Sequence, residues 1–284
     1  MKFAIIGFDF YLSVFESFLS AGWEPVKAFT WPTDGRFDTN SAFEQLARSR
    51  KIPIQLSRIQ NEDFEDLERR GCEVLICGGY PWRIGDWRKH LPHAINFHPS
   101  PLPDGRGPYP SVRAILEGRD EWAVSCHKID LSIDTGDILT QMFFPMTPDE
   151  THESLFLKTQ LNVRKLAQHV SSNFNDLWSN AKPQIGGSYW NRWTDEERTL
   201  DFSKDVADIM KIVRAFGKIE CFAQLNNRRI FIRRAVAWEE AHNHPAGQPV
   251  HRHENMLVIA AKNGYVGLIE YSLIDPLLAH QMGR

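Results

Sequence analysis

An amide and an imidazole lie two residues apart at the end of a strand-like run. Asn96 and His98 close the apolar pattern of residues 94–98, and side chains two apart on a strand point to the same face. A neutral amide donor beside a titratable imidazole suits acyl transfer, because the amide can stabilise an oxyanion while the imidazole moves a proton. The alternative is structural, with Asn96 ordering a turn and His98 satisfied by hydrogen bonds.

Two further segments have residues suited to a ligand site. Asp134 precedes a Thr-Gly turn after the strand-like run 123–129, where the alternative is an ordinary turn carboxylate. Gly78 and Gly79 follow a buried run that ends at Cys77, and two glycines let the backbone approach a flat ligand closely. The alternative there is a tight connection from a strand to a helix.

The elements that must position these residues alternate between strand and helix through the first half of the chain. Ligands in such open α/β sheets gather at the carboxyl ends of the strands. The alternation predicts right-handed βαβ units and a doubly wound, mostly parallel α/β sheet. The expected strands are 2–7, 25–29, 54–56, 73–77, 94–98 and 123–129, and the expected helices are 10–21, 43–49, 63–69, 112–117 and 151–179.

The pattern changes after residues 182–187, which contain Pro183, Gly186 and Gly187. We expect Ser203 to cap a helix, followed by strands at 221–225, 229–237, 257–260 and 266–271. A helix followed by short consecutive strands indicates a small β domain of the OB-like barrel type. The predicted domains are therefore 1–181, a linker at 182–196, and 197–284.

Composition excludes several classes of protein. The 284 residues are 42% apolar and 24% charged, as in a globular protein. No apolar run approaches the ~20 residues of a membrane span. The net charge of −3 does not favour a broad nucleic-acid surface, although Arg228, Arg229, Arg233 and Arg234 form a local basic strip.

Other signals favour ordinary structural roles. The four cysteines lack paired metal spacing, and the dinucleotide fingerprint G-x-G-x-x-G is absent. Because no carboxylate or cysteine frame accompanies His242, His244, His251 and His253, we expect them in a solvated loop and predict no metal site. The first ten residues read as a strand and not as a signal peptide, so we expect a reduced, cytoplasmic protein with no membrane contact.

Taken in order, the Asn-x-His pair, the proline-glycine loop after it and the Asp-Thr-Gly turn resemble the folate-dependent formyltransferase family. The resemblance implies a formyltransferase-like Rossmann variant in which residues 1–181 bind the formyl-folate, with Asn96, His98 and Asp134 as the catalytic trio. His127 falls where many members also have a histidine. The resemblance places the pterin end of the folate between Tyr80, Pro81, Trp82, Arg83 and Ile84 on one side and Leu131, Ser132, Ile133, Thr135, Gly136 and Asp137 on the other. It implies an acceptor loop made of Pro101, Leu102, Asp104, Gly105, Arg106 and Gly107.

The implied reaction moves a formyl group from N10-formyltetrahydrofolate to an amine, without a metal or a covalent nucleophile. Two departures from the family's pattern bear on the acceptor. Residues 100–103 read Ser-Pro-Leu-Pro where much of the family has Ser-Leu-Leu-Pro. Residues 217–220 read Gly-Lys-Ile-Glu in place of a proline-rich turn, and the chain stops soon after Tyr271.

These departures favour a small-molecule amine, with an amino sugar on a nucleotide as the first candidate. Transfer to methionyl-tRNA is the alternative, so nucleic acid is not excluded as a partner. A hydrolase that releases formate from the same folate, and a folate- or nucleotide-binding module without activity, are further alternatives. The oligomeric state that we consider for this chain is a homodimer.

Overall fold

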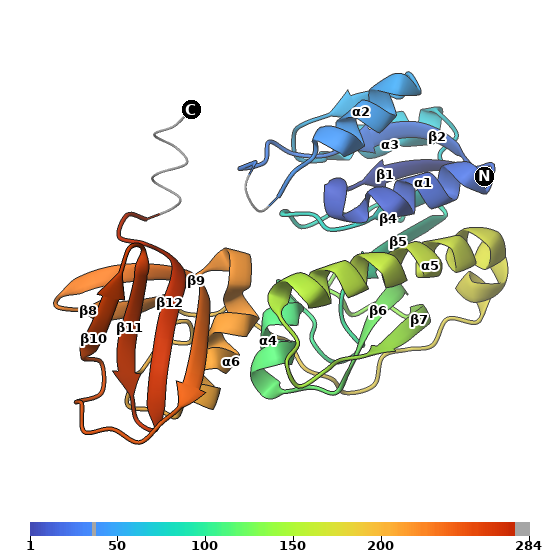
Figure 1. Cartoon of the computed structure of the whole chain (residues 1–284). Coiled ribbons are helices and arrows are strands. Elements are labelled where there is room, and N and C mark those ends of the chain that lie inside the picture. Colours follow the sequence, from blue (N-terminus) through green and yellow to red (C-terminus); the bar gives the residue numbers. More distant parts are fainter. Residues whose placement is uncertain (36–37, 276–284) are drawn as a thin grey trace. The chain divides into compact units, whose positions relative to one another are not determined.

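The computed structural model describes residues 1–35 and 38–275 and divides into two compact units (Figure 1). Unit 1 comprises Met1–Pro110, Glu121–Pro145 and Phe156–Trp190. Unit 2 comprises Ser111–Asp120, Met146–Leu155 and the chain from Asn191 onward. The predicted domain boundaries stay a prediction. The last nine residues of the predicted 197–284 domain lie outside the described residues.

Unit 1 is built on a seven-stranded sheet with the strand order β3-β2-β1-β4-β5-β6-β7. The first five strands run parallel, whereas β6 and β7 are antiparallel to their neighbours. The strands are β1 (Lys2–Ile6), β2 (Glu24–Phe29), β3 (Ile54–Gln55), β4 (Val74–Cys77), β5 (His93–His98), β6 (Glu121–Lys128) and β7 (Ile138–Pro145). The helices are η1 (Asp9–Tyr11), α1 (Leu12–Ser20), α2 (Ser41–Ser49), α3 (Asn61–Arg69), α4 (Pro110–Glu117) and α5 (His152–Ser179). All of α4 except Pro110 belongs to unit 2, as does the start of α5 up to Leu155.

Both faces of this sheet are buried, which explains the continuous apolar runs of its strands. In β1 the side chain of Phe3 packs against the rings of Phe15 and Phe18 in α1. The alternating neighbours Ala4 and Ile6 join the apolar cluster that contains α3. The doubly wound α/β arrangement expected from the alternating pattern is therefore confirmed.

Strand β7 was not expected from the sequence. It pairs with β6 at the edge of the sheet, and its residues alternate irregularly between buried and partly exposed positions. Its sequence is apolar apart from Thr140 and Gln141, so it does not lack an apolar signal. It was missed because it follows β6 directly as an antiparallel partner, without the intervening helix of the expected βαβ units.

Unit 2 contains helix α6 and a five-stranded antiparallel sheet with the order β10-β11-β12-β9-β8. The expected small β domain after a helix is therefore present. Its elements are α6 (Val206–Phe216), η2 (Gly217–Ile219), β8 (Cys221–Leu225), β9 (Arg228–Glu239), β10 (Pro249–His253), β11 (Met256–Ala261) and β12 (Gly264–Ser272).

Two local expectations in unit 2 were wrong. Ser203 does not cap α6, because Asp205 is the N-cap residue and the Oδ1 atom of Asn263 accepts the N–H of Val206 at 2.9 Å. His251 and His253 lie in strand β10 and not in a loop, because the apolar β11 pairs with this polar segment as an exposed edge strand.

Within the described ranges, none of the helices combines the length and hydropathy of a membrane span.

Candidate active site

The carboxyl end of β5 brings an amide, an imidazole and a carboxylate together. Asn96 and His98 leave β5 on the same side, and the loop after β6 presents Asp134 to both. The Nδ2 atom of Asn96 lies 3.4 Å from Oδ1 of Asp134, and the Nδ1 atom of His98 lies 3.6 Å from Oδ2 of Asp134. The structure thus places side by side three residues that are separated by up to 38 positions in the chain.

His127 is a fourth member of this cluster. It lies on β6 opposite Asn96, and its Nε2 atom is 3.1 Å from the Asn96 amide nitrogen. Its Nδ1 atom is 2.8 Å from the carbonyl oxygen of Lys128, and because a carbonyl oxygen only accepts, Nδ1 is the donor. In the neutral ring Nε2 therefore accepts a hydrogen bond from Nδ2 of Asn96. The second N–H of the same amide is then directed toward Asp134.

The tautomer of His98 is fixed by the loop that follows β5. Its Nε2 atom donates to the carbonyl oxygen of Gly105 at 2.9 Å, which leaves Nδ1 to face Asp134. Burial lowers the pKa of His98, against the opposing effects of the Asp134 charge and the Gly105 carbonyl. A neutral His98 therefore presents the lone pair of Nδ1 to the centre of the cluster.

Asp134 is held ionised in an unusual backbone conformation. Burial raises its pKa, but the positive charges that His98 and His127 carry when protonated, together with the Gly107 N–H, outweigh burial and hold the pKa below the ordinary range. The Gly107 N–H donates to Oδ2 at 2.9 Å. The φ angle of Asp134 is +57°, a left-handed conformation that is rare outside glycine and is often found at functional sites.

The close packing of the Asp-Thr-Gly turn predicts that Gly136 tolerates no side chain. A Cβ at Gly136 would overlap the backbone carbonyl of Lys128, which cannot move without disturbing β6. We expect Gly136→Ala to lower the free energy of unfolding by about 2 kcal/mol, as overpacking does, measured by urea denaturation. In the control Gly186→Ala the new Cβ meets no atom within 4 Å, and the left-handed φ of +68° leaves a cost of about 1 kcal/mol. Equal losses in both variants would contradict a steric origin.

The two segments expected to hold the folate are in contact with each other. The guanidinium of Arg83 donates to the carbonyl oxygen of Leu131, so the 80–84 and 131–137 segments are joined. The hydroxyl of Tyr80 accepts the N–H of Ile59 at 2.8 Å. The ring centroids of Tyr80 and Trp82 lie 5.3 Å apart. Leu131 and Ile133 are exposed apolar side chains. The buried Oγ1 atom of Thr135 has no hydrogen-bond partner in the described part of the chain.

The loop that the resemblance assigns to the acceptor contributes to the same cluster through its backbone. Leu102 is buried and donates its N–H to Oγ of Ser125, which anchors the start of the loop. Gly105 and Gly107 supply the carbonyl and the N–H that contact His98 and Asp134. Arg106 points to the segment after α5, where it meets Gln184 and Gly186.

Sequence reasoning did not identify Gln184, and it noted His127 only through the family resemblance. His127 has a sequence signal, since a histidine directly across from Asn96 follows from the pairing of β5 with β6. Gln184 has none, because its segment reads as a linker with Pro183 and Gly186.

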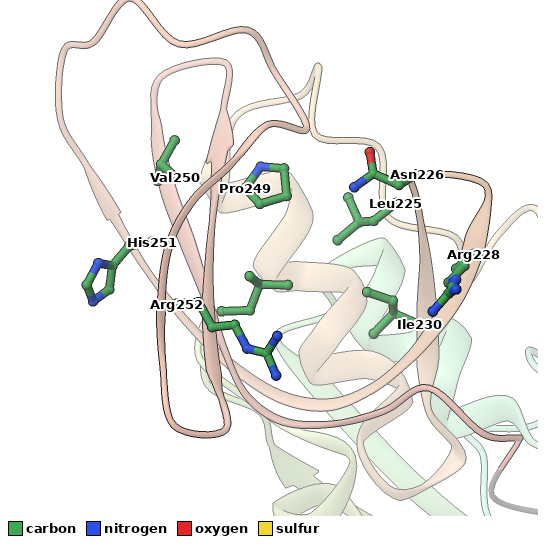
Figure 2. Close-up of a pocket in the computed structure, with 9 residues that line it drawn as sticks. Leu225, Asn226, Arg228, Ile230, Pro249, Val250, His251 and Arg252 are labelled. Atoms are coloured by element: carbon green, nitrogen blue, oxygen red, sulfur yellow. The ribbon is translucent and has the colours of Figure 1, made fainter.

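A cavity of about 650 Å³ lies in unit 2, and none of its lining residues was predicted for catalysis or folate binding (Figure 2). Its apolar surface includes Leu225, Ile230 and Leu257, from β8, β9 and β11. Arg228 and Arg252 approach it from opposite sides, while His251 points away (Figure 2).

Over residues 1–35 and 38–275, no group of three or more His, Cys, Asp or Glu side chains is arranged to hold a metal ion.

Comparison with protein families matches both parts of the chain. The family model described as formyl transferase matches residues 44–168, and the model of the formyl transferase C-terminal domain matches residues 192–275. A methionyl-tRNA formyltransferase of Coprothermobacter proteolyticus is 30% identical over 245 residues, covering 84% of this chain and 77% of the relative. Another, of Marinobacter nauticus, is 26% identical over 267 residues, covering 90% of this chain and 86% of the relative.

Solved structures share the fold at low sequence identity. An N-formyltransferase of Helicobacter canadensis, in complex with folinic acid and dTDP-3-aminofucose, has a TM-score of 0.68 at 18% identity, covering 95% of this chain and 99% of the other. HypX of Aquifex aeolicus, in complex with tetrahydrofolic acid, has a TM-score of 0.69 at 17% identity, covering 94% of this chain and 43% of HypX. At these identities the similarity establishes the fold alone.

Proposed function

The chain belongs to the formyl transferase family, and on that basis we propose that it transfers a formyl group from N10-formyltetrahydrofolate to the primary amine of a small molecule. The first candidate for the acceptor is an amino sugar carried on a nucleotide. The observation that carries the proposal is the convergence of Asn96, His98 and Asp134 around one point, with contacts of 3.4 and 3.6 Å to the carboxylate.

His98 is suited to take the proton that the attacking amine must lose. The amine nitrogen forms a bond to the formyl carbon, and the bond from that carbon to N10 of the folate breaks, so N10 gains a proton while the new amide nitrogen loses one. Because Nε2 of His98 is held by Gly105, Nδ1 is the atom that accepts the proton. The carboxylate of Asp134, 3.6 Å away, then stabilises the imidazolium.

Asn96 is suited to stabilise the charge that develops on the formyl oxygen. Its Nδ2 atom donates at 3.1 Å to His127 and makes a longer contact of 3.4 Å to Asp134. The longer contact is the weaker one, so an oxyanion that approaches along that N–H can take over the hydrogen bond while His127 keeps the amide in place. One well-placed donor of this kind contributes about 3 kcal/mol to lowering the barrier.

The segments 80–84 and 131–137 fit the folate end of the donor. The pterin is a flat ring system, and these segments offer exposed apolar side chains and aromatic rings against which it can pack. When bound, the formyl-folate supplies the one-carbon group, and the chain's contribution is to orient it and to move protons.

A specific observation also favours the second candidate, transfer to methionyl-tRNA. The curated relatives described above are named methionyl-tRNA formyltransferases. In addition, the guanidinium groups of Arg228 and Arg252 have no hydrogen-bond or ion-pair partner in the described part of the chain, and both side chains line the unit 2 cavity (Figure 2). Unpaired arginines over an apolar surface are compatible with contacts to a phosphate backbone.

An acceptor panel tests the proposal directly. The protein is incubated with N10-formyltetrahydrofolate and, separately, an amino-sugar nucleotide, free amino sugars, or methionyl-tRNA, and mass spectrometry detects the product that gains a formyl group. We expect the amino-sugar nucleotide to be formylated. Formylation of methionyl-tRNA alone would replace the first candidate with the second, and formate release without any amine would indicate a hydrolase.

The double variant Arg228→Glu/Arg252→Glu separates the two acceptors further. With a small-molecule acceptor we expect the rate to be unchanged within about twofold, because charge reversal at exposed side chains that take no part in the proposed chemistry has little effect. With tRNA, the loss of two phosphate contacts should lower kcat/KM and reduce its salt dependence. Arg234→Glu is the matched control, since Arg234 is an exposed arginine of β9 that does not line the cavity.

A further inference from the structure

Residues 182–190 run between the 101–107 loop and the 131–137 segment, and we call residues 182–190 the brace. Its backbone pairs with the start of β7 through Lys182 and Ile138, whose N–H and carbonyl groups exchange hydrogen bonds of 2.8 and 2.9 Å. It also pairs with the 101–107 loop: the Arg106 N–H donates to the carbonyl of Ser188 at 3.0 Å, and the Trp190 N–H donates to the carbonyl of Arg106 at 2.7 Å. The brace therefore contacts both catalytic loops within unit 1.

The side chain of Gln184 lies in the middle of the brace and joins the two loops. Its Nε2 atom donates to the carbonyl oxygens of Asp134 at 2.9 Å and Gly136 at 2.8 Å. Its Oε1 atom accepts from Nε of Arg106 at 2.9 Å. All the hydrogen-bonding capacity of the amide nitrogen is thus directed at the turn that holds the catalytic carboxylate.

We propose that Gln184 is a positioning residue, which holds Asp134 in its left-handed conformation and fixes its carboxylate against His98. The backbone of Asp134 has a φ of +57°, a conformation that aspartate tolerates better than most residues but that contacts from its surroundings must hold in place. The carbonyl of Asp134 is bonded by Gln184 and its carboxylate by the Gly107 N–H. Without the first contact the turn is still held by the bond from the Lys128 N–H to the Asp137 carbonyl, but no hydrogen bond holds the Asp134 carbonyl. Local relaxation at Asp134 would swing its carboxylate away from Nδ1 of His98.

The link to Arg106 gives Gln184 a second effect. The guanidinium of Arg106 also donates to the carbonyl of Gly186 at 3.0 Å, so the 101–107 loop is tied to the brace at this point. That loop supplies the Gly105 carbonyl and the Gly107 N–H to the cluster. The amide of Gln184 therefore fixes the 101–107 loop and the Asp134 turn relative to each other, although it touches no reacting atom in the proposed mechanism.

The kinetic test uses three variants and rests on the proposed formyl transfer. Gln184→Ala removes all three hydrogen bonds, and we expect kcat to fall about 10- to 100-fold, as small misplacements of catalytic groups do, with the KM for the formyl donor changed less than threefold. Gln184→Glu keeps the acceptor for Arg106 but directs an oxygen at two carbonyl oxygens, so we expect an equal or larger loss. Ile185→Ala, at a neighbouring side chain that is 86% exposed, should leave kcat unchanged.

A second readout needs no activity. In protein labelled with ¹⁵N-histidine, the Nδ1 resonance of His98 reports the carboxylate that lies 3.6 Å from it. We expect this resonance to shift in Gln184→Ala and not in Ile185→Ala, with unfolding midpoints alike in both. Wild-type kcat in either Gln184 variant, or an unshifted His98 resonance in Gln184→Ala, overturns the inference. Absence of formyl transfer in the wild-type protein, with the resonance shift present, instead overturns the proposed function.

Discussion

Replacing Asp134 by asparagine should abolish formyl transfer while leaving the protein folded. Asparagine has the same shape, tolerates the left-handed conformation at φ +57°, and keeps an oxygen that can accept the Gly107 N–H. It lacks the negative charge that lies 3.6 Å from Nδ1 of His98. Without that charge the imidazolium formed on proton transfer is buried and uncompensated, and we expect kcat to fall about 10³-fold, or about 4 kcal/mol.

The measurement is release of tetrahydrofolate at saturating donor and acceptor, together with the thermal unfolding midpoint. We expect the midpoint of Asp134→Asn to remain within a few degrees of wild type, because its backbone contacts persist. Asp130→Asn is the matched control, since Asp130 is an exposed carboxylate nearby whose Oδ1 accepts the Ser132 N–H. Turnover by Asp134→Asn at more than a tenth of the wild-type rate would rule out an essential charge at this position.

Local sequence reasoning located the trio because each of its members has a local signature. Asn96 and His98 are two apart on a strand, and Asp134 stands before a Thr-Gly turn. None of these signatures is specific alone. Their order along the chain was informative because the carboxyl ends of neighbouring strands meet at one edge of the sheet, so polar residues that follow different strands can converge.

Gln184 shows why the rest of the site could not be predicted. Its contacts join residues 48 to 78 positions away, and two of its partners are backbone carbonyls, which have no residue type to recognise. Proline and glycine around it indicate a loop but give no sign of where that loop lies. Sequence patterns therefore identified the candidate catalytic groups, whose roles stay predictions, and gave no sign of the contacts of Gln184.

The fold follows the same rule. Central strands such as β1 and β4 were predicted because burial on both faces requires an apolar run that is visible in the sequence. The edge strand β10 was missed because it is polar over most of its length, which a strand with one neighbour tolerates. The largely apolar β7 was missed because it follows β6 with no helix between them, contrary to the expected alternation. Edge position alone does not remove the pattern, since the edge strands β3 and β8 were both expected.

Truncation of Asn96 should be the second severe loss, and its kinetic form should identify the role of the amide. In Asn96→Ala the donor to the developing oxyanion is absent, so we expect kcat to fall about 10²- to 10³-fold. Because that interaction forms only in the transition state, the Kd for folinic acid should stay within about threefold of wild type. A weaker Kd with an unchanged kcat would instead assign Asn96 to ground-state binding.

The double variant Asn96→Ala/Asp134→Asn tests whether the cluster acts as a unit. Asn96 Nδ2 contacts both His127 and Asp134, so each single substitution already disturbs the geometry on which the other residue depends. We therefore expect the double variant to be about as slow as Asp134→Asn alone, because residues that act together lose their effect together. Rates that multiply, giving a loss of about 10⁵ or more, would show that the amide and the carboxylate act independently on the barrier.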